Sequence, residues 1–140
     1  MSDNKSTDLS QYSDKPLKEK LGLKDTMSAY YLRAPTEYWQ ELGIKQQPYD
    51  DNSGEYDFIH AFFTSKEEMS NFADILVSKM SKNGILWVSW PKMSARKDIL
   101  SGINEQDLRD IFLPHGIVDI KVCAVTDKWS GLKFVWRRKP

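Results

Sequence analysis

The chain has 140 residues, 40% of them hydrophobic, so it can bury one core but is too short for two ordinary domains. Its 20 Lys and Arg balance 20 Asp and Glu, which argues against a dedicated nucleic-acid binder. The single cysteine, Cys123, excludes an internal disulfide framework and a cysteine-based zinc cluster, and it suits a reducing compartment. We therefore expect one cytoplasmic domain, with Cys123 as a core thiol.

The start of the chain is polar and has too little apolar surface to offset the entropy of ordering it. We expect residues 1–14 to form a disordered tail and residues 15–140 to form a single α/β domain. No segment has the apolar core of a signal peptide or the roughly twenty apolar residues of a membrane span, so we expect no membrane association.

The first elements are a helix, a strand and a second helix. Residues 16–22 predict a short helix that ends at Gly22, because glycine suits the position after a helix. The apolar and aromatic residues 27–32 predict the first strand. Pro35 then opens a helix that ends at Gly43.

After an exposed polar loop over residues 45–55, the apolar run 56–63 predicts a second strand. Ser65 and Glu68 have the spacing of a capping box, which predicts that a helix begins there. Its apolar residues recur at helical spacing through Met80.

An Asn83-Gly84 turn leads into the third strand, residues 85–90, whose two faces are both apolar as in a covered central strand. A loop over residues 91–103 follows, and Asn104 caps another helix with Asp107 three residues later.

The chain closes on two strands, residues 118–125 and 132–137, joined by the hairpin loop 126–131, so the final strand should run antiparallel. The pattern predicts a Rossmann-like, three-layer α/β domain with a mostly parallel sheet of about five strands and a C-terminal antiparallel hairpin. We expect right-handed parallel crossovers, which leave one sheet face bare unless the strand order reverses, the N-terminal helix covers it, or a homodimer does.

The order of helix, sheet and hairpin resembles the end of a class I methyltransferase. The strings KPLKEKLGLK, YDFIHAFFTS, GILWVSWPK and VDIKVCAVTDKWSGLKF also resemble a family of small bacterial proteins, a domain of unknown function, over roughly residues 15 to 138. That resemblance implies a compact domain and no particular activity. A second lysine commonly follows Lys92 in that family, and Met93 stands there in this chain, which weakens a paired-lysine site.

The turn after the first strand, LRAPTEYW, lacks the glycines that let a backbone approach phosphate or ribose. We therefore expect no tight binding of NAD or S-adenosylmethionine there, and we predict no cofactor. His60 and His115 are interpreted as structural residues. The carboxylates of residues 50–57 lack the alternation of calcium ligands, so we predict no metal site.

The best functional signal is topological, because ligands of open parallel sheets bind beyond the carboxyl ends of the strands. Cations and indoles gathered there suit an anion and a planar group, together with the free N–H groups of helix starts. The candidate ligand-binding residues are Arg33, Ser65, Lys66, Trp90, Lys92, Ser94, Trp129 and Ser130. The simpler interpretation, which we favour for these residues, is that they are capping residues and solvated lysines around a core tryptophan.

We favour a non-catalytic or cofactor-poor methyltransferase-like domain that binds a small anion or a protein partner at this edge. The alternative is a transferase with a non-standard cofactor site. A third hypothesis, an RNA-associated accessory domain, depends only on the terminal WRRK and a basic rim.

Overall fold

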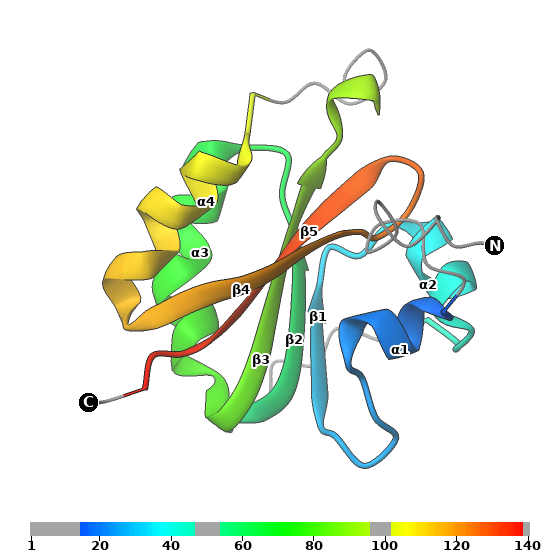
Figure 1. The fold of residues 1–140 in the computed structure, drawn as a ribbon, viewed down its shortest axis with the longest axis horizontal. Helices are drawn as coiled ribbons and strands as arrows, with labels where there is room; N and C mark the ends of the chain where they lie inside the picture. The colour runs from blue at the N-terminus through cyan, green and yellow to red at the C-terminus, as the bar shows by residue number, and fades with distance from the viewer. Residues whose placement is uncertain (1–14, 47–53, 96–101, 139–140) are drawn as a thin grey trace, which may run out of the picture.

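The computed structural model describes residues 15–46, 54–95 and 102–138, which form a sheet between two layers of helices (Figure 1). The strands are β1 (Ala29–Leu32), β2 (Tyr56–Phe62), β3 (Met80–Pro91), β4 (Ile117–Ala124) and β5 (Trp129–Trp136). The helices are α1 (Leu17–Leu21), α2 (Thr36–Leu42), α3 (Lys66–Ser78) and α4 (Glu105–Phe112), with 3₁₀ turns at Met93–Ala95 and Leu113–His115. The predicted tail, residues 1–14, lies outside the described residues.

The five strands form one sheet in the order β1-β2-β3-β5-β4. β1, β2 and β3 pair in parallel, and β5 lies antiparallel between β3 and β4. The predicted Rossmann-like α/β fold is therefore confirmed, including the last strand beside its predecessor. None of the helices in the described part of the chain is long and apolar enough to cross a membrane.

Each face of the sheet is covered by its own pair of helices (Figure 1). One core lies under α3 and α4 and includes Met69, Leu76, Leu108, Phe112, Ile59, Leu86 and Phe134. The other lies under α1 and α2 and includes Leu21, Tyr38, Leu42, Phe58, Trp87 and Cys123. The sequence left three explanations open for how the second face is covered. The structure shows that the N-terminal helix, α1, covers it together with α2.

The position of α2 corrects the expectation of uniformly right-handed crossovers. β1, β2 and β3 follow one another across the sheet in parallel, so connections of the same hand would place α2 and α3 on the same face. They pack against opposite faces, and hence the two connections have opposite hands. Right-handed connections are favoured because the twist of the strand directs a short link onto one face of the sheet. Thirteen residues, 43–55, separate α2 from β2, so this connection is long enough to escape that constraint.

The predicted Asn83-Gly84 turn is wrong, because both residues lie inside β3, which begins at Met80. The register of β2 with β3 shifts between Tyr56, which pairs with Met80, and Phe58, which pairs with Ile85. The residues of β3 between Met80 and Ile85 therefore form a bulge beside β2. A Cβ on Gly84 would lie 3.0 Å from the carbonyl oxygen of Tyr56. Glycine is therefore required here for a close backbone approach and not for a turn.

Candidate functional site

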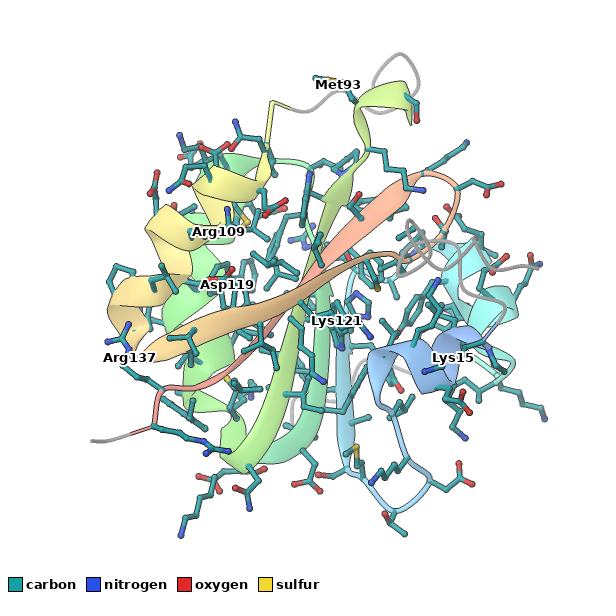
Figure 2. The ribbon with its side chains drawn as sticks, in the orientation of Figure 1. Lys15, Met93, Arg109, Asp119, Lys121 and Arg137 are labelled. Carbon is teal, nitrogen blue, oxygen red and sulfur yellow. The ribbon has the colours of Figure 1, made fainter. Side chains whose placement is uncertain are left out.

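The carboxyl ends of β1, β2 and β3 all lie at one edge of the sheet, as parallel strands require. Figure 2 labels Met93, which follows β3 and projects beyond this edge. Its side chain is exposed, and Ser94 beside it is exposed in the same 3₁₀ turn. The structure thus brings the predicted segments to one edge, and the directions of their side chains decide which can share a ligand.

Arg33 faces α3. Its backbone has φ of 60°, a left-handed conformation that is uncommon for a residue with a side chain. The guanidinium lies 2.9 Å from the carboxylate of Glu68 and 5.6 Å from the ring centre of Phe72. Arg33 therefore fastens the turn after β1 to α3.

Ser65 and Lys66 join the starts of two helices. The Ser65 hydroxyl accepts a hydrogen bond of 3.2 Å from the backbone N–H of Glu68, which caps α3. Lys66 lies 3.3 Å from Asp107, whose carboxylate completes the capping box of α4 with Asn104. Both predicted site residues thus have structural partners.

The two predicted tryptophans lie on opposite faces of the sheet. Trp90 is buried in the core under α3 and α4. Trp129 is buried in the other core, 5.3 Å from the ring of Phe62. They cannot stack on one planar ligand together. Trp129 and Ser130 also belong to β5 and not to the hairpin loop, and Ser130 pairs with Trp90 in the ladder.

Lys92 differs from the other predicted residues, because it lines a cavity of about 210 Å³ at the carboxyl edge. Its backbone N–H donates a 2.8 Å hydrogen bond to the carbonyl of Lys128, which fixes the segment after β3 beside the hairpin loop. The other lining residues are Lys20, Glu41, Ala124, Val125, Thr126 and Asp127. The cavity therefore lies on the α1 and α2 side of the sheet, away from Arg33 and Lys66.

Four lysines lie near Cys123, and two of them, Lys20 and Lys92, also line this cavity. Sequence reasoning missed all of them except Lys92. Burial raises the pKa of the Cys123 thiol, and the charges of Lys20, Lys121, Lys133 and Lys92 all act to lower it. Lys121 and Lys133 are directly paired across β4 and β5. Figure 2 labels Lys121 near the middle of the sheet.

Backbone carbonyls accept hydrogen bonds from two lysines of this group. The Lys121 ammonium donates to the carbonyl of Lys20 at 3.3 Å, and the Lys20 ammonium donates to that of Ala124 at 3.4 Å. Burial and the neighbouring Lys121 lower the pKa of Lys133. Within the described residues, no carboxylate lies at ion-pair distance from any of the four lysines of the group. The sequence alone, through the alternation of side chains along a strand, could predict that Lys121 and Lys133 lie on the same face of the sheet. That they lie directly opposite each other follows only from the register of β4 with β5.

A chain of buried polar side chains links α2 to the sheet. His60 Nδ1 lies 3.0 Å from the Tyr38 hydroxyl, and His60 Nε2 lies 2.7 Å from the Ser89 hydroxyl. Burial lowers the pKa of His60 and raises that of Tyr38, so both are neutral. A serine beside a histidine is the pairing of a nucleophile with its base. All three side chains are fully buried, however, and their arrangement is structural.

The residues present do not fit S-adenosylmethionine. The turn after β1 contains no glycine, and its Arg33 is held against α3. In doubly wound folds that bind nucleotides, the strand beyond the first carries the carboxylate that holds the ribose. Among the described strands, β1 is the edge strand, and that neighbour is missing.

Comparison with solved structures identifies the same architecture in other proteins, a methyltransferase among them. LepI, in a complex with SAH and a substrate analogue, matches with a TM-score of 0.55 and 9% identity over 86% of this chain and 39% of its own. An S-adenosylmethionine-dependent methyltransferase from Clostridium acetobutylicum matches with a TM-score of 0.51 and 5% identity over 71% of this chain and 68% of its own.

Magnesium protoporphyrin IX methyltransferase from Synechocystis PCC 6803, with bound SAM, is 19% identical with a TM-score of 0.49 over 72% of this chain. The chain spans about half the length of that enzyme, 47% and 51% in two structures. No protein-family model and no curated protein sequence matches the chain. At these identities the likeness concerns the fold alone: the chain has a Rossmann-like α/β fold, which it shares with the S-adenosylmethionine-dependent methyltransferase from Clostridium acetobutylicum and with LepI.

Proposed function

We propose that this protein is a non-catalytic, methyltransferase-like domain that binds a small anion at the carboxyl edge of its sheet. The observation that carries the proposal is the group of four lysines without a carboxylate partner among the described residues, two of which line the cavity at that edge. Lys20 and Lys92 are the residues that contact the anion. Arg33, Lys66, Trp90 and Trp129 have other partners and are not part of this site.

The charges of the lysine group favour an anion energetically. Like charges that are directly opposite across two strands destabilise a sheet, and Lys121 and Lys133 are such a pair. A bound anion would offset this repulsion. Glu41 and Asp127 also line the cavity, so a small anion of low charge fits better than a polyanion.

The size of the cavity argues against a nucleotide cofactor. Its volume of about 210 Å³ is smaller than the roughly 300 to 1,000 Å³ typical of sites for drug-sized ligands. Inorganic phosphate, sulfate and short dicarboxylates are therefore the ligands to test.

The test is a titration of Lys92→Ala with inorganic phosphate, sulfate and succinate by isothermal calorimetry. The change removes one charge-assisted hydrogen bond, so the binding free energy should weaken by about 1.5 to 3 kcal/mol. The melting temperature should change little, because a partly exposed lysine contributes little to stability.

Lys66→Ala is the matched control, because Lys66 is a lysine at the same edge that pairs with Asp107. It should bind the same anions as the unaltered protein. An equal loss of affinity in both variants, or no binding of any of the three anions, would contradict the proposal.

A further inference from the structure

A second and larger cavity lies at the opposite end of the sheet. It has a volume of about 720 Å³, and its lining includes Lys82, Ile120, Val135, Trp136, Arg137 and Arg138. Figure 2 shows Arg137 near the C-terminal end of the described chain, far from Met93 at the carboxyl edge. The cavity shares no lining residue with the proposed anion site.

One wall of this cavity is apolar and held in place. The indole N–H of Trp136 donates a 2.9 Å hydrogen bond to the carbonyl of Ser81, which fixes the ring beside the start of β3. Ile120 is 56% exposed, and among the described strands it is the one large apolar side chain that is exposed. It lies at the shift of register between Asp119 and Lys121, where a residue of β4 is left without a partner. The shift therefore presents an apolar side chain at the cavity.

The rim of the cavity is cationic. Lys82, Arg137 and Arg138 line it, and its lining contains no carboxylate. In the described part of the chain none of these three cations lies at ion-pair distance from an acid. Arg109, which lines a different cavity together with Ile120, shows the contrast, because it pairs with Glu105 and, at 3.1 Å, with Asp119. Figure 2 labels Arg109 and Asp119. The positive charge of the rim is left for a ligand.

We propose that this cavity binds an organic anion with a flat apolar body and one acidic headgroup. The body packs on Ile120, Val135 and Trp136, as apolar surfaces do when they leave water. The headgroup, a carboxylate, sulfonate or phosphate, is bound by the two arginines, whose planar forks match such groups. The cavity volume lies within the range of sites for ligands of this size.

A nucleic-acid strand suits this surface less well. Binding a strand without sequence preference requires a cationic groove that follows several phosphates. Here three cations gather at one cavity in a chain whose positive and negative residues balance. A single headgroup beside an apolar wall accounts for both features.

Two fluorescent probes that differ in one charge test the proposal with the full chain. Anilinonaphthalene sulfonate has the apolar body and an acidic headgroup, and phenylnaphthylamine has nearly the same body without the acid. The sulfonate should bind at least about tenfold more tightly than the neutral probe, which is the worth of one charge-assisted hydrogen bond. The double variant Arg137→Gln/Arg138→Gln should abolish that difference, and Ile120→Ala should weaken both probes several-fold.

Lys92→Gln at the carboxyl edge is the control and should leave both probes unchanged, so that failure here is separable from failure of the proposed function. Heteronuclear NMR of the indole groups, with the Trp136 signal identified by Trp136→Phe, should show the sulfonate shifting that signal. Equal affinities of the two probes, or a sulfonate affinity that the double variant leaves intact, would overturn the proposal. Displacement of the probe by a short uridylate oligomer at micromolar concentration would assign the cavity to nucleic acid instead.

Discussion

His60 shows how one residue couples the stability of this fold to pH. Its ring is fully buried between the hydroxyls of Tyr38 and Ser89. Neither partner carries a charge that would favour a protonated imidazole, so burial lowers the pKa of His60 well below its ordinary value. The folded protein therefore holds His60 neutral where the unfolded chain, with a pKa of about 6.5, takes up a proton.

The stability that depends on neutral His60 is present above about pH 6.5 and is lost as the pH falls from there toward the folded-state pKa. Between about pH 7.5 and about pH 5.5, urea titrations should show a decrease of about 1.4 kcal/mol in the free energy of unfolding from this residue. His60→Gln should lack that decrease, whereas His115 stays in both proteins. The same slope in both would show that His60 is not the titrating group.

At the scale of elements, helix ends were the most predictable part of the fold, because caps depend on neighbouring residues. Gly22 and Gly43 end α1 and α2 with φ of 79° and 77°, and Asn104 caps α4 with Asp107, all as the sequence indicates. The start of β3 was not predictable in this way. Asn83-Gly84 has the local signature of a turn, and the pairing of β3 with β2 overrides it.

The pairing of β5 with β3 depends on a glycine at a point of close approach. A Cβ on Gly131 would lie 2.9 Å from Val125 Cγ2, 3.1 Å from Trp87 Cε3 and 3.2 Å from Ser89 Oγ. Gly131→Ala should therefore lower the free energy of unfolding by about 1 to 3 kcal/mol, as overpacking in a core does. Chemical denaturation measures the loss.

Gly102→Ala is the matched control, because a Cβ on Gly102 meets no atom within 4 Å. Its free energy of unfolding should stay within about 0.5 kcal/mol of that of the unaltered protein. If Gly131→Ala is equally harmless, the packing of β5 against β3 is looser than the structure indicates.

The candidate site was predictable only to the level of the sheet edge. Parallel strands bring Arg33, Lys66 and Lys92 to one edge, but their contacts place Arg33 and Lys66 beside α3 and α4 and Lys92 at the cavity on the side of α1 and α2. The sequence could not show which face each occupies, because that depends on the exact ends of strands and on the partners of each side chain. The pairing of Lys121 with Lys133 could not be predicted from the sequence either, because the register of two β-strands depends on the whole fold.

As a whole molecule, the chain resembles one part of a doubly wound domain. Such a domain continues beyond its first strand on the side away from the C-terminal half, and its first helix covers the face opposite the later helices. Here α2 keeps that face, and β2, the next strand among the described residues, pairs with β1 on the side of the C-terminal half, which accounts for the opposite hands of the two connections. In the part of the chain that the structure describes, the strand whose carboxylate would hold a ribose is therefore missing beside β1.

The central claim is that this methyltransferase-like fold is not built to hold S-adenosylmethionine. Isothermal titration calorimetry with S-adenosylmethionine tests it most directly, with inorganic phosphate titrated in parallel under the same conditions. The turn after β1 lacks glycine and β1 is the edge strand of the described sheet, so the cofactor should bind no more tightly than about 1 mM, or about −4 kcal/mol. A dissociation constant in the low micromolar range, about −8 kcal/mol, would contradict the account.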